Sequence, residues 1–317
     1  MGKRMSDQLV CEKLTKIYSN RNIKALDSVS FAIPSSGIFV LIGRNGSGKT
    51  TLVRILATEL EPTSGSATID GIDVVKEPKK LREKIAIVPQ EARPIPWMTP
   101  MQTVLSYLLW RGFNVGEAKR RATESLERLK LGDYSDTLNR MLSGGMKRKV
   151  LVATVLSSEA DIIFLDEPTT GLDPISRREF WDILREIAKK RFTFLTTHYL
   201  EEAEQLADRI GIMDRGRLIN IGTLEELRQK IRYNYSMRLI SRPPDLEVKD
   251  GEILTGRDGQ TRILTVEEEA FRISRELSKE GLKFTINPVS LDDIFFYLVR
   301  LGGREGGDGS AIGETTE

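Results

Sequence analysis

The sequence predicts an α/β protein with a mainly parallel core sheet, a helical insertion and a small C-terminal α+β domain. Three unbroken apolar runs support this prediction: Gly37–Ile42, Asp161–Asp166 and Phe192–Thr197. Helical stretches separate them, and such an alternation is typical of a parallel sheet covered on both faces. The first run leads into a glycine-rich stretch and then into leucines at helical spacing, which indicates a strand, a loop and a helix in that order.

The segments between these strands predict the helical insertion. Residues 99–131 and 144–158 have the patterns of helices. They fall between the first core strand and the later ones, so we place a helical subdomain at about residues 93–160. The first domain as a whole is expected to span residues 1–230.

A second, smaller domain is predicted at residues 231–301. Residues 235–266 have the pattern of strands, with hairpin signals at Asp250-Gly251 and Asp258-Gly259. One apolar helix face follows, formed by Val266, Ala270, Ile273 and Leu277. A strand at Lys283–Asn287 and a helix at Leu291–Leu301 complete the domain, whose role is either to hold two chains together or to bind a regulatory ligand. Glycine-rich residues 302–317 are expected to be a disordered tail.

The composition is that of a globular protein in a reducing compartment. The chain has 317 residues, of which 39% are hydrophobic and 30% are charged. Its 48 basic and 46 acidic residues are too evenly balanced to predict a nucleic-acid or membrane-surface binder. Cys11 is the single cysteine, which excludes a disulfide framework and a cysteine-rich metal site.

No segment of the sequence predicts a membrane span. Met1–Asp7 is polar and lacks the apolar core of a signal peptide. The uncharged runs Ser28–Gly43 and Pro94–Trp110 contain prolines and are shorter than the roughly 20 apolar residues that a spanning helix needs. We therefore expect a cytosolic chain, with any membrane role carried by a separate subunit.

A phosphate-binding loop is predicted directly after the first core strand, because GRNGSGKT at Gly43–Thr50 matches G-x-x-x-x-G-K-[ST]. The glycines let successive N–H groups point at a phosphate, and the following helix adds its positive dipole end. Lys49 can reach the β- and γ-phosphates, and the Thr50 hydroxyl can hold Mg²⁺. The expected nucleotide-binding residues of the loop are Gly43, Arg44, Asn45, Gly46, Ser47, Gly48, Lys49, Thr50 and Thr51.

Polar side chains follow two of the predicted core strands. Asp166 and Glu167 stand where an apolar strand ends, so Asp166 suits a Mg²⁺ site and Glu167 could polarise an attacking water. His198, the only histidine, ends another core strand at the same edge of the sheet. Its imidazole could therefore reach the γ-phosphate as an uncharged donor.

A second anion-binding element is predicted at Ser143-Gly144-Gly145, which opens the helix at 144–158. One nucleotide needs only one phosphate loop. A second such element in the chain therefore suggests a nucleotide shared between two chains.

Together these residues resemble the nucleotide-binding domain of ATP-binding cassette (ABC) proteins, over roughly residues 8–225. The resemblance implies a P-loop NTPase fold, Mg-ATP hydrolysis with Glu167 and His198 as catalytic residues, and a dimer of cassettes with two shared sites. It also implies that Tyr18 stacks on adenine, although from the sequence alone Tyr18 could be an ordinary core or surface residue. By the same resemblance Gln90 joins Thr50 and Asp166 at Mg²⁺, and Asp173 lies in a loop that crosses the dimer interface. Met146 stands where the family usually has glutamine.

The C-terminal segment refines the resemblance. Pro288–Leu298 is similar to the closing helix of ATPase subunits of drug and antibiotic exporters, which implies a membrane-spanning transporter subunit as partner and a place at the cytoplasmic face of the membrane. A soluble or regulatory ATPase of the same class is the alternative, and no nucleic acid is expected. The apolar stretch Pro94–Met98 either packs within the helical insertion or forms the surface where the membrane subunit docks.

Overall fold

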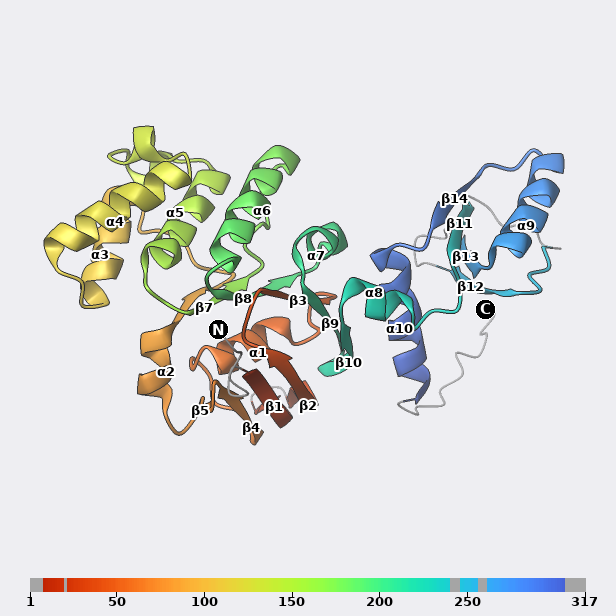
Figure 1. Cartoon of the computed structure of the whole chain (residues 1–317), viewed down its shortest axis with the longest axis horizontal. Coiled ribbons are helices and arrows are strands. Elements are labelled where there is room, and N and C mark those ends of the chain that lie inside the picture. Colours follow the sequence, from red (N-terminus) through yellow and green to blue (C-terminus); the bar gives the residue numbers. More distant parts are fainter. Residues whose placement is uncertain (1–7, 20–21, 240–245, 256–260, 306–317) are drawn as a thin grey trace, which may run out of the picture. The chain divides into compact units, whose positions relative to one another are not determined.

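The computed structural model describes residues 8–19, 22–239, 246–255 and 261–305 (Figure 1). The chain divides into two compact units, Met1–Leu218 and Ile219–Glu317. The domain boundary near residue 230 stays a prediction.

The central sheet has six strands in the order β10-β9-β3-β8-β7-β6. The pairs β3–β8, β3–β9, β7–β8 and β6–β7 are all parallel, which confirms the predicted sheet type. Every residue of β3, β7 and β8 is buried, as expected for apolar strands that helices cover on both faces. The strands are β3 (Ile38–Gly43), β6 (Ile85–Val88), β7 (Ile162–Asp166), β8 (Phe192–Thr197), β9 (Arg209–Asp214) and β10 (Arg217–Gly222).

Short loops and helices connect these strands. Because parallel strands need crossover connections, helices alternate with strands along this part of the chain. The carboxyl ends of β3, β6, β7 and β8 therefore lie at the same edge of the sheet. The connecting helices are α1 (Lys49–Leu56), α2 (Pro78–Lys84), α6 (Pro174–Ala188) and α7 (Leu200–Leu206).

A second sheet, in the first unit and of order β2-β1-β4-β5, is antiparallel and is not among the elements predicted from the apolar runs. In β2 the buried residues Val29, Phe31 and Ile33 alternate with exposed ones. A strand with one buried face has this alternation in place of a continuous apolar run, so β2 carries no continuous apolar signal. The strands are β1 (Gln8–Tyr18), β2 (Ile23–Pro34), β4 (Ser64–Ile69) and β5 (Ile72–Asp73).

The helical insertion contains α3 (Pro100–Trp110), α4 (Val115–Arg128) and α5 (Gly144–Ser157), which pack together (Figure 1). Short 3-10 turns at Gly132–Tyr134 and Asn139–Met141 lie between α4 and α5. The segment predicted as helical at 99–131 is interrupted, because Gly112 has a φ of 93°. A new helix, α4, then begins at Val115. Its N-cap is Asn114, whose side chain accepts a hydrogen bond from Glu117 N at 2.9 Å.

The second unit contains an antiparallel sheet of order β12-β13-β11-β14. The strands are β11 (Tyr235–Leu239), β12 (Gly251–Thr255), β13 (Thr261–Thr265) and β14 (Phe284–Pro288), and the helices are α8 (Leu224–Arg228), α9 (Glu267–Lys279) and α10 (Leu291–Glu305). Of the predicted apolar face, Ala270, Ile273 and Leu277 are buried on α9 against Met237 and Ile263 of the sheet, whereas Val266 is the half-buried N-cap that precedes the helix. Helix α10 extends into the segment assigned to the tail, and residues 306–317 lie outside the described residues.

One of the two hairpin predictions is wrong. Strands β11 and β12, on either side of Asp250, are not neighbours in the sheet, because β13 lies between them. Gly251 is instead the first residue of β12, where a Cβ would stand 2.7 Å from Leu264 O and from a Val248 methyl carbon. Glycine is therefore present here for close packing, not for a turn. The signal at Asp258-Gly259 lies outside the described residues.

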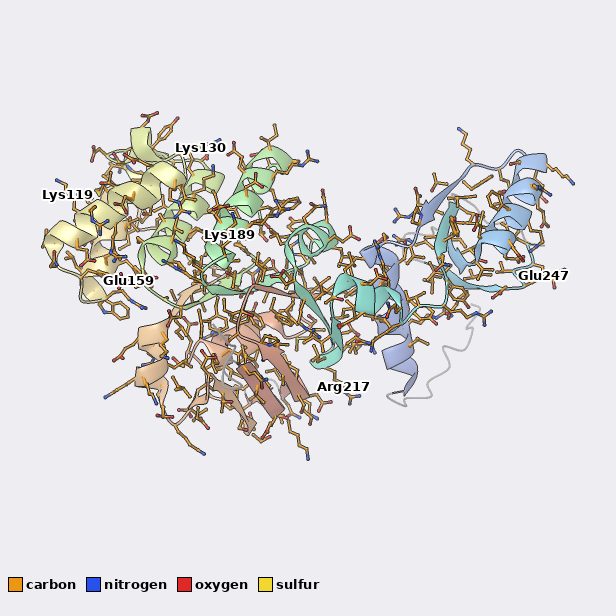
Figure 2. The ribbon with its side chains drawn as sticks, viewed as in Figure 1. Lys119, Lys130, Glu159, Lys189, Arg217 and Glu247 are labelled. Atoms are coloured by element: carbon orange, nitrogen blue, oxygen red, sulfur yellow. The ribbon has the colours of Figure 1, made fainter. Side chains whose placement is uncertain are left out.

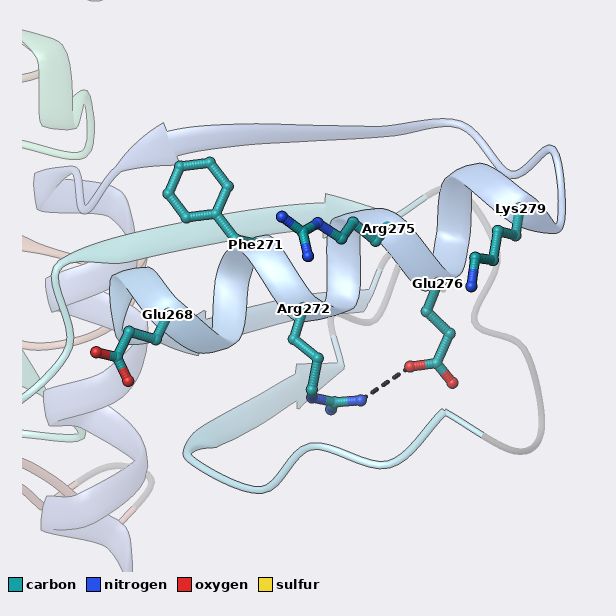
Figure 3. Close-up of a pocket in the computed structure, with 6 residues that line it drawn as sticks. All are labelled: Glu268, Phe271, Arg272, Arg275, Glu276 and Lys279. Carbon is teal, nitrogen blue, oxygen red and sulfur yellow. Dashed lines mark hydrogen bonds and ion pairs between the residues drawn. The ribbon is translucent and has the colours of Figure 1, made fainter.

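Charged side chains cover the outer surfaces of both units. On the first unit Lys119, Lys130 and Lys189 are exposed, and Lys130 Nζ forms an ion pair with Glu179 Oε1 of α6 at 2.9 Å (Figure 2). In the second unit, the outer face of α9 presents a shallow hollow lined by Glu268, Phe271, Arg272, Arg275, Glu276 and Lys279 (Figure 3). No helix in the described ranges is both long enough and apolar enough to cross a membrane.

Candidate active site

The phosphate loop lies between β3 and α1, as predicted. Gly46 and Gly48 have φ angles of 79° and 105°, in the left-handed region that favours glycine. A Cβ on Gly48 would stand 2.4 Å from Ala25 O, so a side chain there would collide with the backbone of β2. The turn is closed by a hydrogen bond from Ser47 N to Arg44 O at 3.1 Å. The loop therefore has the backbone that wrapping around a phosphate requires.

Lys49, the first residue of α1, is buried with its ammonium group inside the loop. Its Nζ donates to Gly43 O at 2.9 Å and to Arg44 O at 3.2 Å. The same nitrogen lies 3.5 Å from Glu167 Oε1. Burial lowers the pKa of Lys49, and the neighbouring Glu167 carboxylate opposes that shift. The ammonium group is thus at the place where phosphate oxygens would be bound.

The carboxylate of Asp166 is buried at the end of β7. Its Oδ1 accepts a hydrogen bond from Thr196 Oγ1, whereas Oδ2 is buried without a hydrogen-bond partner among the described residues. Burial raises the pKa of Asp166, and the hydrogen bond from Thr196 opposes the shift. Thr50 Oγ1 in turn donates to Gln90 Oε1 at 3.4 Å. Thr50, Gln90 and Asp166 therefore offer a hydroxyl oxygen, an amide oxygen and an unpaired carboxylate oxygen. These oxygen donors fit Mg²⁺.

Glu167 is held at the centre of the site. Its Oε2 accepts hydrogen bonds from Gln90 Nε2 at 3.2 Å and Thr170 Oγ1 at 3.2 Å. His198 Nδ1, at the end of β8, lies 3.1 Å from the same oxygen. The backbone of Glu167 has a φ of 47°, which costs on the order of 1 kcal/mol for a residue with a side chain. Such a conformation persists only where surrounding contacts fix it.

The structure thus brings together five predicted site residues from four separate segments. They are Lys49 and Thr50 at the start of α1, Gln90 after β6, Glu167 after β7 and His198 after β8. Because the carboxyl ends of parallel strands meet at one edge of a sheet, residues far apart in the sequence converge here.

Tyr18 lies beside this cluster at the end of β1. Its hydroxyl is 3.4 Å from Thr51 Oγ1 of α1, and its ring is partly exposed. The Lys16 ammonium lies 5.7 Å from the ring centroid. An aromatic ring next to the phosphate-loop helix is compatible with stacking on a base.

Ser143 and Asp173 are used as caps of their own helices. Ser143 Oγ accepts from Met146 N at 3.2 Å at the start of α5, and Ser143 and Gly144 are exposed. Asp173 Oδ1 accepts from Ile175 N and Ser176 N, both at 3.0 Å, at the start of α6. A side-chain hydrogen bond from Ser176, together with these backbone hydrogen bonds, lowers the pKa of Asp173. Both segments therefore present helix N-termini at the surface.

Two residues that the sequence did not single out support the site. The Thr196 hydroxyl donates a hydrogen bond to Asp166 Oδ1, and the Thr196 carbonyl oxygen accepts one from Glu167 N at 3.1 Å. Arg148, in α5, donates to the carbonyl oxygens of Asp166 and Glu167 at 2.8 and 3.1 Å. In the sequence Arg148 belongs to the basic run Lys147–Lys149, which has the pattern of a solvated helix surface, so no local signal marks it as buried.

A phosphate loop with a buried lysine, beside an Asp–Glu pair at the end of a parallel strand, defines a P-loop nucleoside triphosphatase. Residues 26–170 match the protein family described as ABC transporter. The chain is 35% identical, over 90% of both sequences, to the daunorubicin/doxorubicin resistance ATP-binding protein DrrA of Streptomyces peucetius. The chain belongs to the ABC transporter family.

Two further similarities bear on the assignment. The doxorubicin resistance ATP-binding protein DrrA of Mycobacterium tuberculosis is 40% identical over 70% of this chain and 67% of that protein. A solved dimeric ATP-binding cassette in a post-hydrolysis state, bound to ADP and Pi, has a TM-score of 0.63 and 27% identity, covering 68% of this chain and 98% of that one. The resemblance, fold class and ATPase activity predicted from the sequence are confirmed. The protein is an ATP-hydrolysing, nucleotide-binding subunit of an ABC transporter.

Proposed function

We propose that this chain is the ATPase of a drug or antibiotic exporter and that it works beneath a separate membrane-spanning subunit. The observation that carries this proposal is the extent of the similarity to the S. peucetius protein. The alignment covers 300 residues, so it includes the second unit as well as the cassette. A relative that shares only the cassette would support ATP hydrolysis alone.

The site supports a mechanism in which Glu167 activates water. A carboxylate can accept a proton from water only where it is fixed and aimed, and the donors Gln90 and Thr170 orient its Oε2. Lys49 and the loop amides would bind the phosphates, while His198 would donate to the γ-phosphate. Thr50, Gln90 and Asp166 would hold Mg²⁺, which would neutralise phosphate charge when bound.

The exposed helix starts at Ser143–Gly145 and Asp173 support a nucleotide shared between two cassettes. Backbone N–H groups at a helix N-terminus favour an anion. Gly144 leaves open space where a Cβ would be, so a phosphate group could approach its backbone. In the proposed dimer, Ser143–Gly145 of each chain faces the phosphate loop of the other.

An apolar surface supports docking of the membrane subunit at the cytoplasmic face. The Trp97 side chain is 74% exposed and Ile95 is 43% exposed, whereas Pro94 is buried. The neighbouring Met141 is 71% exposed, and Arg140 N donates to Pro96 O at 3.0 Å. We define Ile95, Pro96, Trp97 and Met141 as the apolar docking surface. An exposed aromatic and methionine cluster of this kind favours a protein partner.

The proposal is tested by coexpressing the full chain with a membrane subunit encoded next to it and preparing inverted membrane vesicles. ATP-driven accumulation of a fluorescent anthracycline is expected with the wild-type chain and is expected to be absent with Glu167→Gln. If the active ATPase purifies without a membrane protein and the vesicles take up no anthracycline, a soluble or regulatory ATPase is favoured instead.

A further inference from the structure

Arg148 of α5 is a buried arginine whose hydrogen-bond partners are main-chain carbonyl groups. Its side chain is 7% exposed. Nε donates to Pro168 O at 3.0 Å, and Nη2 donates to Asp166 O at 2.8 Å and Glu167 O at 3.1 Å. Nη1 donates to Pro89 O at 3.2 Å and Gln90 O at 3.3 Å. A guanidinium group has five N–H donors, and these five carbonyl oxygens match them in number.

The positive charge of the Arg148 guanidinium group is buried against the dipoles of main-chain carbonyl groups. A buried cation is costly unless polar groups replace its hydration. Burial and the nearby Arg93 lower the pKa of Arg148 to about 10, so the group remains charged at neutral pH. Burying this charged side chain costs free energy of folding, and the contacts of Arg148 show which segments it holds together.

Those contacts link three segments of the active site. Pro89 and Gln90 follow β6, and Asp166, Glu167 and Pro168 end or follow β7. Arg148 itself lies on α5, five residues beyond the N-cap Ser143. The peptide of Glu167 is thus held on both sides, its N–H by Thr196 O at 3.1 Å and its carbonyl by Arg148. This double restraint accounts for how Glu167 keeps its left-handed backbone.

We propose that Arg148 is a positioning residue, which fixes Glu167 and Gln90 relative to α5 and thereby couples the Ser143–Gly145 segment to the hydrolytic carboxylate of the same chain. The inference rests on the proposed role of Glu167. A shift of α5, caused by a nucleotide at Ser143–Gly145, would move the guanidinium group and with it the carbonyl groups of both loops. Each composite site would in this way sense the occupancy of the other.

The geometry predicts a specific effect of substitution. Lysine has three donors on one nitrogen and cannot span carbonyl groups of both loops, so Arg148→Lys keeps the charge and loses the fork. Arg148→Met keeps the aliphatic stem and loses every donor. Misplacing a catalytic group by about 1 Å costs on the order of a hundredfold in rate. We expect kcat to fall by about ten- to a hundredfold in Arg148→Met and less in Arg148→Lys.

The experiment measures steady-state ATPase activity of the purified full chain, together with the Kd of a fluorescent ATP analogue and the Tm. The matched control is Arg111→Met, because Arg111 also donates to main-chain carbonyl groups, those of Arg82, Glu83 and Ile85. These lie before or at the start of β6, away from Glu167. We expect both methionine variants to lose thermal stability. Only Arg148→Met should lose kcat, with Kd and KM within about threefold of wild type and with partial rescue by Arg148→Lys.

The proposal is overturned if Arg148→Met keeps wild-type kcat, if its defect lies in KM, or if Arg111→Met loses as much kcat. Should Arg148→Met fail to fold, Arg148→Lys decides in the same way: unchanged kcat rejects the positioning role, and reduced kcat with unchanged Kd supports it. Glu167→Gln separates this inference from the proposed mechanism. If Glu167→Gln is inactive while both Arg148 variants are fully active, Glu167 keeps its role and only the inference fails.

Discussion

Lys49 Nζ lies 3.5 Å from Glu167 Oε1, and the two side chains are 4% and 6% exposed. The cation of the phosphate loop and the carboxylate after β7 therefore form one buried ion pair. Removing one member of such a pair leaves the other charge buried without its partner, which is more costly than the pair is stabilising. Substitutions at either residue must consequently be judged by nucleotide binding and by stability together.

Lys49→Ala is expected to lower the affinity for Mg-ATP by at least about tenfold, because phosphate charge loses its main cation in a site shielded from water. Titration of the purified chain with a fluorescent ATP analogue checks this, and a Tm measurement records the cost to Glu167. Lys80→Ala, an exposed lysine on α2, is the control and should bind normally. Wild-type affinity and turnover in Lys49→Ala would refute the assignment of the phosphate loop.

Glu167→Gln is expected to bind Mg-ATP and to lose at least about a hundredfold in kcat, since an amide cannot accept a proton from water as a carboxylate does. Its trapped ATP should shift the chain toward a dimer on a sizing column. Glu91→Gln provides the comparison, because Glu91 is an exposed carboxylate that directly follows Gln90. Hydrolysis at the wild-type rate by Glu167→Gln would place the general base elsewhere.

The sequence predicts those parts of the site that adjacent residues determine, and those strands whose residues are buried without interruption. The phosphate loop is read from adjacent residues because its backbone geometry depends on the glycines themselves. The convergence of Glu167 and His198 could be expected because the ends of parallel strands meet at one edge, whereas the place of Gln90 was implied only by the family resemblance. In contrast, buried and exposed residues alternate along β2, so this strand contains no continuous apolar run.

Arg148 and Gly251 show what local patterns cannot predict. Arg148 lies in a basic run, and its burial depends on carbonyl groups 18 to 59 residues away in the sequence. Gly251 follows an aspartate, which mimics a hairpin signal, although close packing of β12 against β13 is what requires glycine there. Both depend on tertiary contacts, and single-sequence patterns contain no information about such partners.

Ser143→Arg is expected to block hydrolysis while the isolated chain still binds nucleotide, because in the proposed dimer Ser143 acts on the ATP of the partner. Ser143→Ala is the control, since it removes the cap of α5, worth about 1 kcal/mol, without adding bulk or charge. When Ser143→Arg and Lys49→Ala chains are mixed, one composite site has both defects and the other is intact. Mixing should therefore restore activity where the intact site works independently, whereas a silent mixture is expected if both sites must be occupied together. Full activity of unmixed Ser143→Arg would exclude a shared site.

Glu202 of α7 predicts a pH-dependent stability. Burial raises the pKa of Glu202 above 4.5, while hydrogen bonds from Thr197, Thr169 and Trp181 oppose the shift. The folded chain thus binds this proton more tightly than the unfolded chain, so stability falls as pH rises from about 4.5 through the folded pKa. Glu202→Gln cannot lose the proton. Its Tm relative to wild type should therefore increase between pH 4.5 and 7.5.

Thermal unfolding of both chains across this pH range measures the difference, which removes contributions from other titrating groups. Glu201→Gln, on the exposed side of the same helix, controls for the change in net charge. A Tm difference between Glu202→Gln and wild type that stays constant or decreases with pH would show that Glu202 does not bind its proton more tightly in the fold.

Trp97→Ser is expected to weaken copurification with the membrane subunit while leaving ATPase activity of the isolated chain within about twofold of wild type. The reason is exposure: the Trp97 side chain is 74% exposed, so its removal costs the fold little, whereas an interface would lose a large apolar anchor. Trp110→Ser is the matched control, because Trp110 is 81% exposed and lies at the end of α3, outside the apolar docking surface. Detergent extraction and quantification of the two subunits measure the effect. If Trp97→Ser copurifies normally and Trp110→Ser does not, the membrane subunit docks on α3 instead.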